Sequence, residues 1–313
     1  MTKTVLGTKK ELSWNYIKKS VLKDWDLYLL ISPVLIYYII FHYAPMYGIQ
    51  IAFKNFSPGR GILGSPWVGI KYFTRFFNSF YFERVITNTI TISAYSIAAG
   101  FICPVLLGLM LNEVTAIRYK KTLQTITYAP YFLSTVVMVG MIVNLFGTNG
   151  IVNNVMKLLE IEQIDFMVKP QYFKNLYVWS GVWQSTGWGS IIYLAALSGI
   201  DPELHEAAKI DGAGRFRRIW HINIPGIMPT MTILLILSVG GIMNVGFEKI
   251  FLMQNDINLE ASDVISTYVY RVGLLGAEYS FSAAVGLFNS VINFIILLTV
   301  NRIAKKIGSS SLF

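Results

Sequence analysis

Long apolar runs separated by short polar stretches dominate this chain of 313 residues. Six runs are long enough to cross about 30 Å of hydrocarbon as α-helices that rise about 1.5 Å per residue. The runs cover approximately residues 27–53, 84–112, 123–148, 176–198, 227–253 and 281–303. The pattern predicts an all-α integral membrane protein with six transmembrane helices.

These runs and the polar stretches between them divide the chain into four regions. They are a lysine-rich tail over 1–26, a first transmembrane helix with its outer loop over 27–83, a helical membrane domain over 84–303, and a short tail over 304–313. In the outer loops, the aromatic and basic run 71–77 and the amphipathic run 151–159 predict short helices at the membrane surface.

The distribution of Lys and Arg orients the predicted helices. Sixteen of these residues lie in the N-terminal tail, the 113–122 loop, the polar stretch 199–226 and the C-terminus, whereas the alternate loops contain eight. Because cytoplasmic loops carry the excess of positive charge, both termini and the stretch 199–226 are predicted to be cytoplasmic. The net charge of +9 therefore reflects topology and does not indicate a nucleic-acid partner.

The polar stretch between the fourth and fifth runs predicts a short exposed helix. Asp201 can cap its start, Pro202 suits its first turn, and Gly212 can end it in a left-handed conformation. These signals predict a helix over about 202–211.

A second amphipathic segment follows this helix. It begins after Gly214 and carries Phe216 and Trp220 on one side, with arginines on the others. Pro225 is expected to end it. We call the whole stretch 199–226 the elbow.

The spacing of residues in the elbow resembles the EAA signature of permease subunits of ATP-binding-cassette (ABC) importers. That signature is Glu-Ala-Ala, three residues, Gly, nine residues, and Ile-x-Leu-Pro. The elbow has Glu206-Ala207-Ala208, Gly212 and Ile222-x-Ile224-Pro225 at the same intervals, with Ile224 in place of Leu. The resemblance implies a type I ABC importer permease fold in which the elbow is a cytoplasmic coupling helix between transmembrane helices 4 and 5.

The resemblance also implies contact residues and partners. A coupling helix sits in a groove of an ATPase subunit, and the residues expected to make this contact are Leu204, Glu206, Ala207, Ala208, Asp211, Gly212 and Phe216. The implied partners are two ATP-binding-cassette ATPase subunits, a second homologous permease subunit and an extracytoplasmic solute-binding protein, in the cell membrane of a bacterium. The alternative interpretation of the elbow is an interfacial helix that only lies on lipid headgroups.

Two patterns near the first run narrow the resemblance. Pro45-Met-Tyr-Gly48 and Gly64-Ser-Pro-Trp-Val-Gly69 are similar to one branch of carbohydrate importers, whose permeases take up oligosaccharides derived from complex polysaccharides. The similarity implies an oligosaccharide as the cargo.

No pattern of catalytic residues occurs in the sequence. The single cysteine, Cys103, lies in an apolar run, the three histidines are scattered, and no Gly-x-x-x-x-Gly-Lys loop is present to hold ATP phosphates. The chain is therefore predicted to be neither an enzyme nor a metal or cofactor protein. ATP and Mg would be bound by the partner ATPase subunits.

An ion-coupled secondary transporter or a channel, working without ATPase partners, is the alternative function. Such a protein needs charged residues at mid-membrane. The only acidic residue within the six runs is Glu248, near the outer end of the fifth.

The candidate substrate path follows the fourth run with help from the fifth and sixth. Aromatic rings can stack on sugar C–H faces, and amides can hydrogen-bond sugar hydroxyls. By their depths, the residues proposed to line the path are Trp183, Gln184, Trp188, Asn244 and Asn289. The alternative is that these side chains only join helices to one another.

Overall fold

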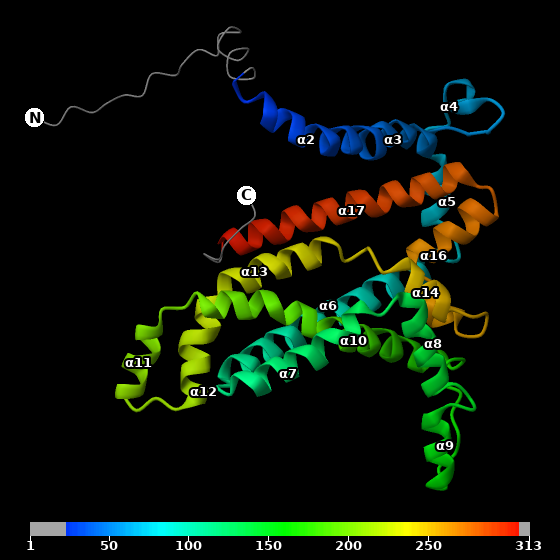
Figure 1. The fold of residues 1–313 in the computed structure, drawn as a ribbon. Coiled ribbons are helices and arrows are strands. Elements are labelled where there is room, and N and C mark those ends of the chain that lie inside the picture. Colours follow the sequence, from blue (N-terminus) through cyan, green and yellow to red (C-terminus); the bar gives the residue numbers. More distant parts are fainter. Residues whose placement is uncertain (1–22, 307–313) are drawn as a thin grey trace, which may run out of the picture.

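The computed structural model describes residues 23–306, and the parts of the predicted tails at 1–22 and 307–313 lie outside the described residues. Every regular element within residues 23–306 is helical, and the β structure there is limited to one bridge between Lys54 and Trp67. Figure 1 shows long, roughly parallel helices with the elbow at one end. We call this the elbow end and the other the opposite end. The predicted all-α class is confirmed.

Five helical stretches within the described part of the chain are long and apolar enough to span a membrane. They are Trp25–Phe53, Phe82–Glu113, Thr135–Leu158, Arg215–Gly240 and Tyr279–Lys306. Two of them, α6 (Phe82–Glu113) and α17 (Tyr279–Lys306), are continuous α-helices close to their predicted ranges.

The fourth predicted span is α10 (Pro170–Ser198), which begins earlier than predicted. Its 29 residues make it about 43 Å long, which is enough to span a membrane. It is not among the five stretches named above, because it contains many polar residues. It packs along α6 (Figure 1), and glycines allow the approach. A Cβ atom on Gly108 of α6 would lie 3.1 Å from the Cβ atom of Tyr193 on α10.

The predicted continuous span 123–148 is wrong, because the structure breaks it in two. The helix α7 (Ile117–Tyr128) gives way to a 3-10 turn at Ala129–Phe132, and α8 (Thr135–Phe146) begins after it. Pro130 cannot donate a backbone hydrogen bond, which explains a break at this point. Ser134 then caps α8 by accepting a hydrogen bond from Val137 N.

The predicted continuous span 227–253 is also wrong. The helix α13 (Ile224–Gly240) ends in a turn, and a separate helix, α14 (Phe247–Met253), follows it. A Cβ atom on Gly240 would lie 2.6 Å from the side chain of Leu297, so the glycine lets the end of α13 approach α17.

The expectation that Pro225 ends the second elbow segment is wrong as well. The short helix α12 (Arg215–Arg218) continues through a π-helical segment, Ile219–Asn223, directly into α13. A proline inside an α-helix clashes with the carbonyl four residues earlier. The wider π turn just before Pro225 relieves that clash, so the helix passes through it.

The first span stands apart from the others. The helix α2 (Trp25–Tyr38) has no buried residue, and it continues through short helical segments, including α3 (Ala44–Met46), to a 3-10 helix, η2 (Tyr47–Phe53). Figure 1 shows α2 lying beyond α17, whereas η2 packs against α17. The first span therefore joins the bundle only at the opposite end.

Short helices surround the opposite end. The short helices predicted over 71–77 and 151–159 are present as α5 (Lys71–Phe77) and α9 (Ile151–Leu158), and their position at the membrane surface stays a prediction. Further short elements, which the sequence pattern did not predict, are α4 (Gly61–Gly64), α15 (Leu259–Ser262), α16 (Ile265–Val269) and the π-helical segment η5 (Tyr270–Leu275).

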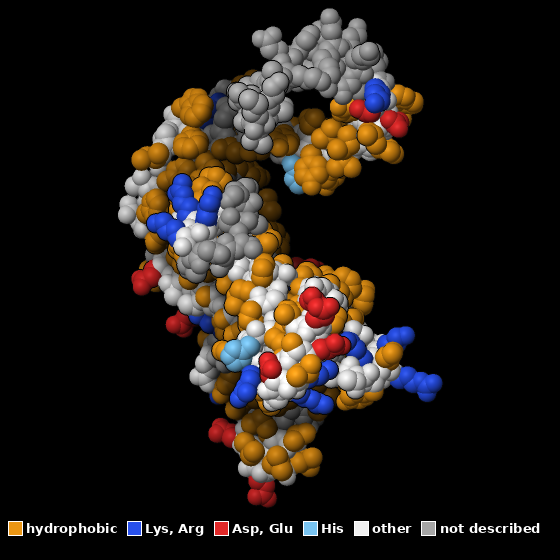
Figure 2. Space-filling view, turned by 90° about the vertical axis from the view of Figure 1, so that its left-hand side faces the viewer, with side chains coloured by type: hydrophobic (Ala, Val, Ile, Leu, Met, Phe, Trp, Pro, Cys, Tyr) orange, Lys and Arg blue, Asp and Glu red, His pale blue; other side chains and the backbone are white. Residues whose placement is uncertain are grey.

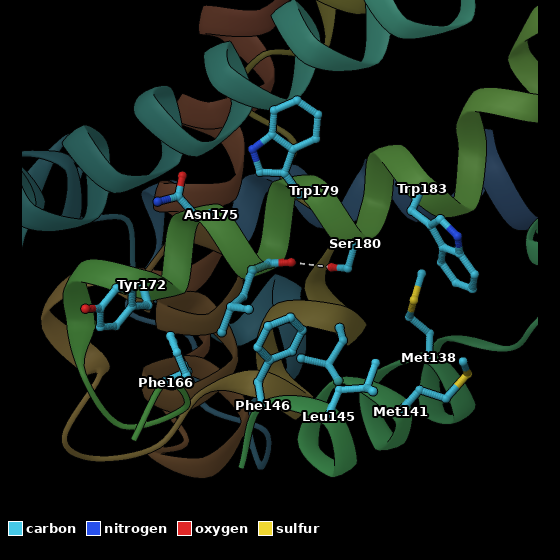
Figure 3. A pocket seen from close by; sticks show the side chains of 12 residues that line it. Met138, Met141, Leu145, Phe146, Phe166, Tyr172, Asn175, Trp179, Ser180 and Trp183 are labelled. Carbon is cyan, nitrogen blue, oxygen red and sulfur yellow. Dashed lines mark hydrogen bonds between the residues drawn. The ribbon is translucent and has the colours of Figure 1, made fainter. Parts of the chain in front are cut away.

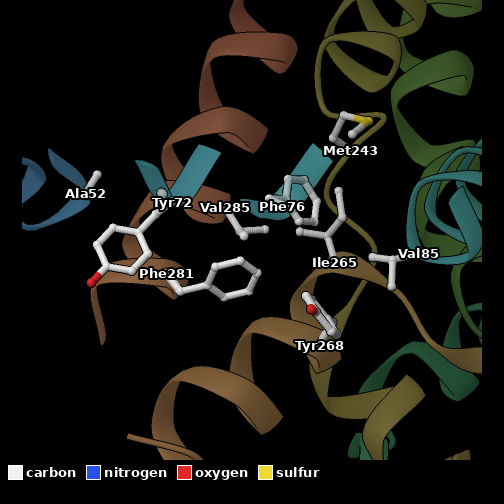
Figure 4. Packing of buried hydrophobic residues seen from close by; sticks show 10 residues of the cluster. Ala52, Tyr72, Phe76, Val85, Met243, Ile265, Tyr268, Phe281 and Val285 are labelled. Atoms are coloured by element: carbon white, nitrogen blue, oxygen red, sulfur yellow. The ribbon is translucent and has the colours of Figure 1, made fainter. Parts of the chain in front are cut away.

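An aromatic core holds the opposite end together (Figure 4). Its centre is Phe76 of α5, whose ring lies between 5.0 and 6.4 Å from the rings of Phe82, Tyr268, Phe281 and Phe288. These rings come from α6, α16 and α17, so one buried residue joins four helices.

Candidate functional site

The first half of the elbow is the helix α11 (Pro202–Ile210), as the sequence predicts. The carboxylate of Asp201 accepts a hydrogen bond of 3.0 Å from Glu203 N and so caps the helix. At the other end Gly212 has a φ of +74°. The amides of Gly212 and Ala213 donate to the carbonyl oxygens of Lys209 and Ala208, so a Schellman motif closes the helix.

The elbow exposes large apolar side chains. Leu204 and Ile210 on α11 are 54% and 87% exposed, and Phe216 and Trp220 on the second half are 88% and 69% exposed. Figure 2 looks toward the elbow end, where acidic and basic side chains gather among hydrophobic ones. Such a mixed surface is typical of a site that contacts another protein.

The Glu-Ala-Ala triplet of the signature, with Asp211 and Gly212, lies on this exposed surface. Glu206, Ala207, Asp211 and Gly212 are exposed, and Ala208 is half-buried. None of these five residues packs in a hydrophobic core of the described chain. Their role as ATPase contacts stays a prediction.

The base of the elbow is anchored to the bundle. A buried cluster formed by Val105, Leu109, Tyr193, Leu197 and Ile227 joins α6, α10 and α13. A Cβ atom on Gly226 would overlap the side chain of Ile200, so glycine at this position lets α13 approach the end of α10. Arg218 Nη2 also lies 4.0 Å from Glu113 Oε2 at the end of α6. The two ends of the elbow are therefore attached to these three helices.

The structure brings two of the predicted path residues together. Asn289 on α17 donates a hydrogen bond of 3.0 Å from Nδ2 to Oδ1 of Asn244, which lies in the turn between α13 and α14. The pair joins the interrupted fifth span to the sixth.

Two other predicted path residues contact the break between α7 and α8. Gln184 donates a hydrogen bond of 2.8 Å to the backbone oxygen of Leu133. The indole of Trp188 stacks on Tyr131 with ring centroids 4.6 Å apart and planes 4° apart, and it also meets Phe132 edge-on. Both side chains hold α10 against the segment that interrupts the third span.

Trp183 lines the larger of the cavities beside α10, of about 520 Å³ between α8 and α10. Figure 3 shows Trp179 and Trp183 projecting from α10 and Met138, Leu145 and Phe146 rising from α8. The walls are almost entirely hydrophobic, with few polar groups to receive sugar hydroxyls.

Two smaller cavities with more polar walls lie between α6 and α10. One, of about 230 Å³, includes Ser96, Gln184, Ser185 and Lys249 in its wall. The other, of about 350 Å³, continues along the same two helices to Tyr193 and to Ser238 of α13. Ser96 and Gly100 line both, so the two cavities adjoin along α6 and α10 and extend toward the elbow end. We call the two cavities together the polar track.

The sequence reasoning missed Lys249, although a signal was present. Lys249 lies within the predicted fifth run, where a charged residue is a marker of function.

The sequence reasoning also missed a buried ion-pair network at the opposite end, and here the sequence contains no signal. The side chain of Asp263 is fully buried, and its Oδ2 accepts from Arg84 at 2.9 Å and from Arg271 at 2.7 Å. Asn88 of α6 also donates to the backbone oxygen of Asp263. Arg84 and Asp263 lie 179 positions apart in the chain, so the sequence does not indicate that they pair. Through Asp263 the network fixes α6 to η5.

No group of three or more metal-ligating side chains occurs within the described residues. The elbow and the polar track are two features through which the bundle could contact other molecules. Together with the membrane-length helices, they define the membrane-spanning component of a transporter.

Comparison with known proteins agrees with this class. The family of binding-protein-dependent transport system inner membrane components matches residues 104–309, and the chain belongs to this family.

Individual relatives extend the match to nearly the whole chain. Protein LplB of Bacillus subtilis (strain 168) is 43% identical over 99% of this chain and 96% of its own length. The polygalacturonan/rhamnogalacturonan transport system permease protein YteP of the same organism is 41% identical over 97% of this chain and 95% of its own length.

A solved structure has the same fold. A chain of the bacterial alginate ABC transporter in complex with an alginate pentasaccharide-bound periplasmic protein has a TM-score of 0.87 and 39% identity, and the match covers 94% of this chain and 99% of that chain. This protein is thus an integral membrane permease with an ABC importer fold.

Proposed function

We propose that the chain is the permease subunit of an ABC importer that takes up oligosaccharides, fragments of complex polysaccharides, with ATP hydrolysed by separate subunits. The observation that carries the proposal is the exposed elbow, which has the EAA spacing and is joined at its base by a buried cluster to α6, α10 and α13. Two of the named relatives, the polygalacturonan/rhamnogalacturonan transport system permease protein and the alginate ABC transporter, support the choice of cargo.

The elbow is proposed to dock on an ATPase subunit. The small residues Ala207 and Ala208 allow a partner surface to approach the backbone of α11, and the exposed Phe216 supplies an apolar anchor. ATP and Mg would be held by two such ATPase subunits, one for each permease.

A second permease subunit is proposed to complete the transporter. The helix α2 is apolar on all sides, and it has no buried residue in the described chain. One chain also supplies one elbow, whereas two ATPase subunits require two. A homologous permease beside α2 would supply the second elbow and the other wall of the path.

The topology proposed from the charge distribution places the elbow end in the cytoplasm and the opposite end outside the bacterial cell membrane. An extracytoplasmic solute-binding protein would then deliver cargo to the short helices at the opposite end, among them α5 and α9.

An ion-coupled carrier is the less favoured function. Such a carrier needs acidic groups that bind and release ions within the membrane, and Glu248 is exposed and forms no ion pair within the described residues. The family match favours the ABC importer instead.

Reconstitution tests the proposal. The chain would be co-purified with the products of neighbouring genes and placed in liposomes, and ATP hydrolysis and oligosaccharide uptake would be measured with cargo-loaded binding protein. We expect Glu206→Ala to lose uptake, whereas the matched variant Glu203→Ala, one turn earlier on α11, keeps it. Uptake driven by an ion gradient without ATP would contradict the proposal.

A further inference from the structure

Lys249 on α14 places an ammonium group beside α10, within the bundle. Its Nζ atom donates a hydrogen bond of 2.8 Å to the backbone oxygen of Tyr177 and lies 4.7 Å from the centre of the Tyr177 ring. A Cβ atom on Gly181 would lie 3.2 Å from Nζ, so the glycine leaves the room that the ammonium occupies.

No carboxylate balances this charge. The four ion pairs within the described residues do not include Lys249. Glu248 precedes it, but consecutive helical residues do not face each other, and Glu248 is exposed. An ammonium has three donors, and one of them is used on Tyr177.

The unused donors adjoin the polar track. Lys249 lines the cavity of about 230 Å³ together with Ser96, Gln184 and Ser185. The hydroxyl of Ser96 is itself buried without a hydrogen-bond partner within the described residues. A cavity that combines an unbalanced cation with a free hydroxyl is complementary to an anion that carries hydroxyl groups.

We propose that Lys249 forms a subsite of the translocation path that binds the carboxylate of an acidic sugar, so that the transporter selects uronic-acid oligosaccharides. The inference rests on the proposed function, because an importer of oligosaccharides would meet this anion as a sugar acid. Gln184 and Ser185 would hydrogen-bond the hydroxyls of the same sugar ring. The continuation of the track past Gly100 to Tyr193 and Ser238 gives the bound sugar a way toward the elbow end.

A matched pair of ligands isolates the charge. Trigalacturonate and its methyl ester have the same rings and length, but only the acid is anionic. The full chain, with the subunits that co-purify with it, would be placed in lipid nanodiscs, and the Kd of each compound would be measured by calorimetry. We expect the acid to bind about tenfold more tightly than the ester, as for one charge-assisted hydrogen bond.

Substitutions then assign the preference to Lys249. We expect Lys249→Met to bring the Kd of the acid close to that of the ester and to leave the ester within about twofold of wild type. Lys249→Arg should keep the preference. The control is Lys174→Met, because Lys174 also lies on the bundle but donates to Thr91 and does not line the cavity.

Three results would overturn the inference. The first is a wild type that binds the acid and the ester with the same Kd, and the second is a Lys249→Met variant with the wild-type ratio of the two Kd values. The third is a Lys249→Met variant that loses acid and ester binding equally, which would mean that Lys249 only joins α14 to α10. If Lys249→Met fails to fold, amine labelling of Lys249 in the wild type decides. Trigalacturonate, but not its ester, should slow that labelling, and equal rates would overturn the inference.

Failure of the proposed function has a different signature. If the complex imports no oligosaccharide on ATP hydrolysis, that function fails whatever Lys249 binds. If it imports acid and ester and Lys249→Met changes neither uptake nor the binding ratio, only the acidic subsite fails.

Discussion

Arg218 at the base of the elbow lies 4.0 Å from Glu113 at the elbow end of α6. The two residues are 105 positions apart in the chain, and both side chains are mostly shielded from solvent. This ion pair connects the proposed ATPase contact to a helix that lines the polar track.

We expect Arg218→Ala to lower the amount of cargo imported per ATP hydrolysed. An ion pair that touches solvent contributes up to about 1 kcal/mol, so the loss should be at most about fivefold. The measurement is uptake and phosphate release in the same liposomes. Glu113→Gln should have the same effect, and Arg217→Ala, on an exposed neighbouring residue, should have none. Additive losses in Arg218→Ala with Glu113→Gln would show that the pair is not coupled.

The positive φ of Gly212 predicts a graded series of substitutions. Gly212 has a φ of +74° and no atom within 4 Å of an added Cβ, so the penalty is conformational rather than steric. We expect Gly212→Val to cost about 1–2 kcal/mol and to disrupt uptake, and Gly212→Asn to cost less, because Asn tolerates this conformation. Gly214→Val is the control, since Gly214 has a φ of −68°. Normal uptake by Gly212→Val would remove the proposed role of the bend.

Trp188 and Trp183 are expected to respond differently to alanine. Trp188 stacks on Tyr131, and an aromatic pair contributes about 1 kcal/mol beyond its burial. Trp188→Ala should therefore lower the melting temperature measured in detergent. Trp183→Ala, which removes a cavity wall, should reduce uptake with little change in melting temperature. Identical melting curves for the two variants would contradict the packing role of Trp188.

Substitutions at Asn244 and Asn289, which share a hydrogen bond, distinguish a role in the substrate path from a role in helix packing. A hydrogen bond between membrane helices contributes about 0.6 kcal/mol, so alanine at either position should change stability by less than about 1 kcal/mol. If the pair lines the path, either variant lowers uptake at normal membrane abundance. Abundance and uptake that fall in proportion would instead assign the pair to packing, and a double-mutant cycle would measure its coupling.

The proposed topology predicts which lysines an impermeant amine reagent reaches in sealed cells. Lys157 on α9 and Lys209 on α11 are both exposed, but they lie at opposite ends of the molecule. We expect the reagent to label Lys157 and to spare Lys209 until the membrane is opened. Mass spectrometry of the labelled peptides gives the result. Labelling of Lys209 in sealed cells would invert the topology and remove the cytoplasmic ATPase contact.

The sequence by itself determined the class of the protein, the long helices α6 and α17 and the first half of the elbow. An apolar run of membrane length forms a helix in hydrocarbon, because a helix satisfies the backbone hydrogen bonds within the segment where no water is present. The start and end of α11 follow from Asp201, Pro202 and Gly212, whose preferences act through neighbouring residues alone. The EAA spacing is also local, so it can be recognised without a fold.

Only the tertiary structure decided where the long runs break and which polar residues meet. Hydropathy averages over a turn at Gly241 or a 3-10 segment at Pro130, because the residues on either side remain apolar. The passage of the helix through Pro225 depends on a π-helical segment, which has no pattern in the sequence. Contacts such as Lys249 with Tyr177 join residues 72 positions apart. They exist because α14 folds back onto α10, and this packing of separate helices leaves no periodic signal along the chain.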